Sequence, residues 1–245
     1  MKPFLLLATR SEDEAADDEY AGFLTAGGLL PPQLHRVRLE AAPMPPIALA
    51  DYSGVIVGGS PFNASDADET KSAVQHRVER ELAGLLDDVV AQDFPFLGAC
   101  YGIGLLTSYL DGVVDDTWSE VAGPIVVNLT PDGEADQLFG RVAPTFEAFV
   151  GHKEACTVLP TGATLLATGA NCPVQAFRIG QNVYATQFHP ELTQAGILTR
   201  LRVYHDNGYF EPDAYDEVIA AIDASTVTEP ATIMKAFVER FGTAG

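Results

Sequence analysis

The first 110 residues alternate short, fully apolar runs with longer stretches of helical content. The apolar runs have the length of strands buried on both faces, at residues 4–8, 37–39, 54–57 and 94–99. The helical stretches lie between and after them, at residues 20–30, 69–90 and 100–110. This alternation predicts an α/β fold, a three-layer sandwich in which helices flank a mainly parallel central sheet.

From residue 118 the pattern changes to β-rich segments separated by turn residues. These segments are residues 121–129, 145–150, 164–168, 174–179 and 183–187. The last two predict a hairpin across Gly180-Gln181-Asn182. Helical patterning returns from about residue 193, so we expect one domain over residues 1–193 and a helical extension, residues 194–245, packed on that domain.

The charge balance excludes several kinds of partner. The chain has 14 basic and 34 acidic residues, and its net charge of -20 would repel phosphate backbones and anionic lipids. We therefore expect neither a nucleic-acid nor a membrane partner. The N-terminal apolar run of about five residues is too short for a signal peptide, which predicts a cytoplasmic location. The acid-rich residues 11–19 are predicted to form a solvated loop that leads into a helix, rather than a metal site.

The three cysteines are Cys100, Cys156 and Cys172, an odd count without a CxxC pair, which favours neither a disulfide framework nor a zinc site. Cys100 stands out because Gly98-x-Cys100-x-Gly102 lies between a predicted strand and a predicted helix, as in a nucleophile elbow. A helix N-terminus there would favour the thiolate. The alternative is a small buried residue with no chemical role, which is the interpretation we give Cys156 and Cys172.

A candidate base follows the predicted hairpin, in Gln187-Phe188-His189-Pro190-Glu191. Proline biases His189 towards an extended conformation, so the side chains of His189 and Glu191 can project to one side. A cysteine nucleophile needs a base, and the base needs a third group to hold its orientation. His189 and Glu191 fit those two roles, whereas the remaining histidines lack such a context.

A glycine pair, Gly58-Gly59, ends the predicted strand at residues 54–57 and precedes Ser60. Glycines let the backbone approach a ligand closely, which is one way to build an oxyanion site opposite an elbow. A plain strand-ending turn explains the pair equally well. It is not a phosphate loop, because the GxxxxGK[ST] spacing is absent.

Taken in order, Gly-Gly-Ser-Pro, Leu-Gly-Ala-Cys-Tyr-Gly and Gln-Phe-His-Pro-Glu resemble the class I glutamine amidotransferase family, and most of all its stand-alone branch similar to the amidotransferase domain of GMP synthase. The resemblance covers about residues 4–193 and implies a flavodoxin-like fold. It implies that Cys100 attacks the side-chain amide of glutamine, giving a γ-glutamyl thioester and ammonia, with no cofactor and no metal. His189 would carry the proton and Glu191 would orient it.

The same resemblance implies further site residues. The backbone N–H groups of Gly59 and Tyr101 would hold the oxyanion, and Gly58 and Ser60 would lie beside the substrate. Gly151-His152-Lys153-Glu154 is similar to the family's Ser-His-x-Asp loop, so His152 and Glu154 are candidate substrate-binding residues. An ordinary surface loop is the alternative for this segment.

One residue departs from the family pattern. Gly104 stands where the family has a glutamine that helps to hold the substrate, so recognition of free glutamine becomes uncertain. The substrate is then glutamine or another γ-glutamyl or amide compound.

The chain continues for about 50 residues after His189 with helical sequence, in which no ammonia-accepting site is visible. A separate synthetase subunit would receive the ammonia, or the protein would hydrolyse its substrate without transfer. A catalytically silent binding relative is the third alternative, although the intact set of three residues favours an enzyme.

Overall fold

The structure is a computed structural model that describes residues 1–210 and 214–242. Its strands are β1 (Phe4–Ala8), β2 (Leu34–Arg38), β3 (Gly54–Val57), β4 (Phe96–Ala99), β5 (Val113–Asp115), β6 (Glu120–Leu129), β7 (Thr145–His152), β8 (Ala155–Val158), β9 (Thr164–Gly169), β10 (Ala176–Ile179) and β11 (Val183–Thr186). Its helices are α1 (Asp13–Gly27), α2 (Ala73–Ala91), α3 (Tyr101–Tyr109), α4 (Pro131–Ala135), α5 (Gln194–Val203), α6 (Tyr215–Ala224) and α7 (Glu229–Phe241).

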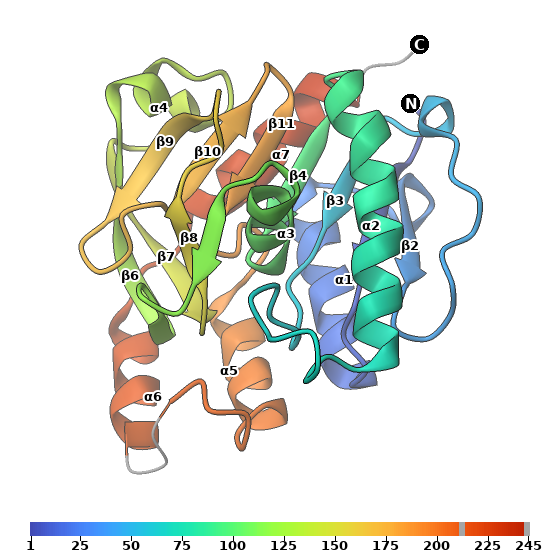
Figure 1. The fold of residues 1–245 in the computed structure, drawn as a ribbon. Helices are drawn as coiled ribbons and strands as arrows, with labels where there is room; N and C mark the ends of the chain where they lie inside the picture. The colour runs from blue at the N-terminus through green and yellow to red at the C-terminus, as the bar shows by residue number, and fades with distance from the viewer. Residues whose placement is uncertain (211–213, 243–245) are drawn as a thin grey trace.

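A nine-stranded sheet with the order β2-β1-β3-β4-β11-β10-β9-β6-β7 forms the centre of the described chain (Figure 1). The pairings from β2 to β11 are parallel, and those from β11 to β7 are antiparallel. Helices α1 and α7 cover one face of the parallel half, and α2 and α3 cover the other. The predicted three-layer α/β architecture with a mainly parallel sheet is thereby confirmed.

The continuous apolar run of β1 follows from burial on both faces of the sheet. Phe4 and Leu6 belong to the core beneath α1 and α7, whereas Leu5 and Leu7 belong to the core beneath α2 and α3. All four side chains are fully buried. Because successive side chains of a strand point to opposite faces, a central strand in such a sheet has no position left for a polar residue.

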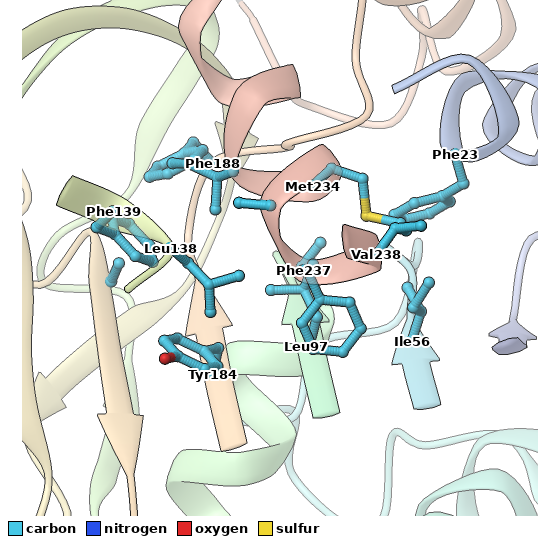
Figure 2. Close-up of a cluster of buried hydrophobic side chains, with 14 of the residues drawn as sticks. Phe23, Ile56, Leu97, Leu138, Phe139, Tyr184, Phe188, Met234, Phe237 and Val238 are labelled. Atoms are coloured by element: carbon cyan, nitrogen blue, oxygen red, sulfur yellow. The ribbon is translucent and has the colours of Figure 1, made fainter. Parts of the chain in front are cut away.

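Helix α7 fills the groove between α1 and the parallel strands (Figure 2). The ring of Phe237 packs against Phe4 with 5.7 Å between their centroids, and Met234 and Val238 lie beside Phe23 of α1. Helices α5 and α6 pack separately, against β6 and β7, through a third apolar cluster that contains Phe149 and Ile222. The C-terminal helices therefore contact the same sheet as the rest of the chain.

The predicted loop at residues 11–19 is wrong, because α1 begins at Asp13 and includes most of this segment. Asp13 and Glu14 lie in its first turn, where acidic side chains interact favourably with the helix dipole. The sequence pattern also missed α4 and the small antiparallel sheet of β5 and β8. These elements are three to five residues long and too short for a periodic signal.

No helix in residues 1–210 and 214–242 combines the length and the apolar character that a membrane crossing requires.

Replacing Phe237 with alanine tests whether the C-terminal helices unfold together with the sheet. Truncation of a fully buried phenylalanine removes apolar contacts and leaves a cavity, so the free energy of unfolding should fall by roughly 3–5 kcal/mol. Urea denaturation followed by far-UV circular dichroism should show one transition. Leu30→Ala, at a side chain that is 67% exposed, is the control and should change the free energy by less than about 0.5 kcal/mol. A separate transition for the C-terminal helices would contradict the proposed single unit.

Candidate functional site

Cys100 occupies the turn between β4 and α3, with φ 53° and ψ -95°. A non-glycine residue rarely adopts this conformation, and its N–H donates to the carbonyl of Thr186 at 2.8 Å. The turn brings Gly98 close to Gly102: a Cβ on Gly98 would lie 2.8 Å from the Gly102 backbone. The flanking glycines therefore allow the close approach of strand and helix that aims the thiol away from the sheet.

Several segments reach this place from the carboxyl ends of the parallel strands. Arg10 follows β1, Gly58 follows β3, Cys100 follows β4 and His189 follows β11. Carboxyl ends of adjacent parallel strands meet at one edge of the sheet, where α/β proteins hold their ligands. Cys100 and His189 line one cavity there, with about 460 Å³ of empty volume, part of it open to solvent.

His189 is buried and its Nδ1 lies 2.9 Å from Glu191 Oε1. Arg200 Nη1 lies 2.9 Å from the same nitrogen, and Arg200 Nη2 donates to Glu191 Oε1 at 2.7 Å. Burial lowers the pKa of His189, and the positive charge of Arg200 lowers it further, against the attraction of Glu191. A neutral His189 that donates Nδ1–H to Glu191 keeps the lone pair of Nε2 available to accept a proton.

The charge of Glu191 is stabilised by its neighbours. Burial alone would raise its pKa, but His189 and Arg200 hold the pKa of this carboxyl well below its usual range. Glu191 thus remains an anion at any pH near neutrality. Sequence reasoning missed Arg200, which lies on α5 eleven residues after His189, because nothing in the pattern of α5 distinguishes this arginine from Arg202.

A second buried ion pair, Arg10 with Glu19, was also missed. Arg10 Nε donates to Glu19 Oε1 at 2.9 Å, and their side chains are 4% and 0% exposed. Burial alone would lower the pKa of Arg10, but the attraction of Glu19 and Tyr204 outweighs it and raises that pKa. The one available signal was Thr9-Arg10 directly after a buried strand.

The glycine pair contacts this ion pair and His189. A Cβ on Gly58 would lie 2.6 Å from Glu19 Oε2, and a Cβ on Gly59 would lie 2.6 Å from His189 Cε1. The N–H of Gly59 donates to Glu19 Oε1 at 3.1 Å. The role expected for this N–H at an oxyanion therefore requires that bond to break. Tyr101 is the first residue of α3, so its N–H is among those that a helix leaves without an intrahelical acceptor.

A second cavity adjoins Cys100 on its other side, and it includes Ser60, Tyr101, Gly104, His152 and Glu154 in its lining. The structure thus brings all of these sequence-predicted residues to the site. Their side chains, however, have specific protein partners.

Glu154 holds the loop that follows Ser60, because its two carboxylate oxygens accept from the N–H groups of Ala64 and Ser65 at 2.7 Å each. Burial raises the pKa of Glu154, against the effect of these hydrogen bonds. A Cβ on Gly104 would lie 3.0 Å from Glu154 Oε1. Glu154 therefore occupies part of the space into which a side chain at position 104 would extend.

His152 is buried, and its ring nitrogens face the carbonyl of Glu154 at 2.9 Å and Glu120 Oε2 at 3.0 Å. Cys172 completes a group with Glu120 and His152 whose potential metal-ligand atoms lie within 4.8 Å of one another. Gln175 Nε2 also donates to Glu120 Oε2, at 2.7 Å. Since these polar atoms already bond to one another, we assign the group a structural role beneath the second cavity.

The expectation that the helix N-terminus favours a Cys100 thiolate did not include the burial of the thiol. Burial raises the pKa of Cys100 to about 12, although Arg10 and Arg200 act in the opposite direction. The resting thiol is therefore protonated at neutral pH. A nucleophile in this state needs a base to remove its proton, which is the role that a neutral His189 can fill.

Comparison with known proteins gives a consistent result. The family model described as glutamine amidotransferase class-I matches residues 33–196. A stretch covering 62% of the chain is 27% identical to the GMP synthase [glutamine-hydrolyzing] of Petrotoga mobilis, and one covering 57% is 28% identical to a protein of Methanobrevibacter smithii that is named as one subunit of the corresponding enzyme. The chain spans 27% of the length of the first relative and 64% of the second.

Solved structures share the fold at low sequence identity. The crystal structure of a glutamine amidotransferase from Thermotoga maritima matches with a TM-score of 0.77 and 16% identity, covering all of both chains. A glutamine amidotransferase from Methylobacillus flagellatus matches with a TM-score of 0.75 and 18% identity, covering 100% of this chain and 97% of that one.

Alkylation tests the accessibility and protonation of the cysteines. Cys100 is partly exposed, whereas Cys156 and Cys172 are fully buried, so iodoacetamide should modify Cys100 first. The rate should keep rising as the pH increases beyond 9, because the pKa of the Cys100 thiol is about 12. Peptide mapping by mass spectrometry gives both results. Equal labelling of the three cysteines, or a rate that is constant above pH 8, would disprove this description of the thiol.

Proposed function

Because the chain belongs to the class I glutamine amidotransferase family, we propose that it hydrolyses the side-chain amide of glutamine or of a γ-glutamyl compound through a thioester on Cys100. The observation that carries this proposal is the shared cavity of Cys100 and His189, with Glu191 2.9 Å from the far ring nitrogen. Nucleophile, base and orienting carboxylate are the three parts that such chemistry requires.

In the proposed reaction, the Cys100 thiol gives its proton to His189 Nε2 while its sulfur attacks the amide carbonyl carbon. The carbon–nitrogen bond of the resulting tetrahedral intermediate then breaks, and the amine leaves with the proton from His189. Water attacks the thioester next, with His189 taking one proton from the water and returning it to the Cys100 sulfur. The products are a free carboxylate and ammonia or an amine.

Glu191 and Arg200 would act together on His189. The Glu191 carboxylate stabilises the imidazolium that forms after proton transfer, and Arg200 fixes that carboxylate through its 2.7 Å bond. Arg200 also approaches Nδ1 of His189, where its N–H would favour the wrong tautomer if Glu191 moved away. The position of Glu191 between the two groups therefore determines which nitrogen of His189 is basic.

The oxyanion would be held by the backbone N–H groups of Tyr101 and Gly59. Tyr101 lies at the start of α3, where the helix dipole favours negative charge. Gly59 would contribute once its N–H is released from Glu19, so the resting site has one of its two proposed donors occupied.

A separate synthetase chain is the proposed acceptor of the ammonia, since two relatives are each named as one subunit of GMP synthase rather than as the whole enzyme. The second of them, from Sulfurisphaera tokodaii, is 29% identical over 61% of this chain. Hydrolysis without transfer is the second candidate, and Gly104 supports it, because the family's substrate-holding glutamine is missing there.

Replacing Cys100 with alanine should abolish release of ammonia and glutamate from glutamine, because no thioester can form. Cys172→Ala is the matched control: Cys172 also lies near a histidine and a glutamate, but it is fully buried, so the variant should keep most of the activity. Glutamate dehydrogenase coupling measures the product, and intact-protein mass spectrometry detects the acyl adduct. If Cys172→Ala lost turnover and Cys100→Ala kept it, the assignment of the nucleophile would be wrong.

The pH dependence of kcat/KM should reflect the lowered pKa of His189. A general base acts in its neutral form, so activity falls only as the pH drops through that pKa, below the ordinary value of 6.5. The ion pair of Glu191 should persist through this range, because a depressed carboxyl pKa gives stability that is lost only as the pH falls below about 4.5. Rates measured from pH 4.5 to 8, with circular dichroism as the folding control, test this. An acid limb centred above pH 7 would contradict the proposed environment.

A further inference from the structure

We propose, building on the cysteine mechanism above, that the substrates are γ-glutamyl conjugates of apolar or aromatic amino acids, whose amine portion occupies the cavity beside His189. This goes further than hydrolysis of glutamine, because it assigns a binding site to the leaving group. Ammonia would need no such site.

Two cavities meet at the thiol, and they share Ser60, Cys100, Gly151 and Tyr209 in their lining. An amide attacked by Cys100 has an acyl portion and an amine portion on opposite sides of the reacting carbon. Each cavity can therefore receive one portion of the substrate.

The position of His189 decides which portion lies in which cavity. His189 lines the first cavity and is absent from the lining of the second. Since His189 returns its proton to the leaving nitrogen as the carbon–nitrogen bond breaks, that nitrogen must lie on the side of the first cavity. The γ-glutamyl portion then extends into the second.

The lining of the second cavity is suited to the charged end of a γ-glutamyl group. Lys153 and Glu154 both line it, together with the polar side chains of Asn63 and Gln187. These are partners for an α-carboxylate and an α-amino group. Gly104 also lies here, so the departure from the family pattern is on the acyl side.

The first cavity has largely apolar walls. Side chains from β7, α5 and the adjoining loops contribute to it, namely Val150, Leu192, Ile197, Leu201 and Phe210. Burying an apolar group against such walls contributes about 0.8 kcal/mol for each methylene, whereas ammonia gains nothing from them. The walls therefore favour a hydrophobic amine over ammonia as the leaving group.

A polar group in the same cavity gives the amine portion a second feature. Arg200 lines the cavity with 8% of its surface exposed, and its Nε has no hydrogen-bond partner within residues 1–210 and 214–242. A buried donor without an acceptor is costly, and a carboxylate on the amine portion would satisfy it. An amino acid supplies both the apolar side chain and this carboxylate.

Kinetics with γ-glutamylphenylalanine and glutamine test the inference. Purified protein should release phenylalanine from the dipeptide with a kcat/KM at least about tenfold higher than for ammonia release from glutamine, as expected for one buried hydrophobic group. Chromatography with mass detection measures phenylalanine and glutamate directly, and Cys100→Ala gives the background for both substrates.

Variants on α5 distinguish binding in the cavity from general effects. Ile197→Phe fills the cavity and should lower kcat/KM for the dipeptide at least about tenfold, while the value for glutamine stays within about threefold. Leu198→Phe is the matched control, since Leu198 is the next residue of the same helix and does not line the cavity. Ile197→Ala should improve use of γ-glutamyltryptophan relative to γ-glutamylphenylalanine, and it remains informative if Ile197→Phe fails to fold.

The two proposals fail in different ways. If Cys100 forms an acyl adduct with glutamine but the dipeptide is used no better, or if Ile197→Phe affects both substrates equally, the leaving-group site is wrong and the cysteine mechanism stands. Glutamine preference would instead make the first cavity a passage for ammonia. If neither substrate acylates Cys100 and Cys100→Ala does not lower turnover, the proposed function itself is wrong.

Discussion

The buried charges at the carboxyl ends of the strands constrain the whole site. Two guanidinium groups, Arg10 and Arg200, and two carboxylates, Glu19 and Glu191, are each less than 10% exposed. An unpaired charge in such surroundings costs several kcal/mol, so each group must keep its partner. Because the four residues come from the end of β1, from α1, from the segment after β11 and from α5, their pairing fixes these elements relative to one another.

The same pairing explains the chemistry of the resting site. Positive charge and burial keep His189 neutral, which suits a base, while burial keeps the Cys100 thiol protonated. Glu19 also occupies the N–H of Gly59. The site is thus organised for proton transfer to His189 when a substrate arrives, rather than for a standing thiolate.

The apolar layers hold these polar groups in register. The helices on the two faces of the parallel strands bury the sheet and leave its carboxyl edge for the loops that carry Arg10, Gly59, Cys100 and His189. At that edge, glycines occur where backbone and side chains approach most closely, at Gly58, Gly59 and Gly98. Packing at this edge is therefore as specific as packing in the core.

The sequence by itself determined the alternation of buried strands and helices, because a strand covered on both faces must be apolar throughout, as residues 4–8 and 54–57 are. It also determined the strand, cysteine, helix order and the spacing of His189 and Glu191, since both are local features of the chain. Only the tertiary structure decided the partners of Arg10, Glu19 and Arg200. These residues pair across 9 or more positions of sequence, and Glu19 reads locally as one more acid in a charged run. Burial, which sets the pKa of Cys100 and divides the space around it into two cavities, depends on elements far apart in the chain and has no local pattern to reveal it.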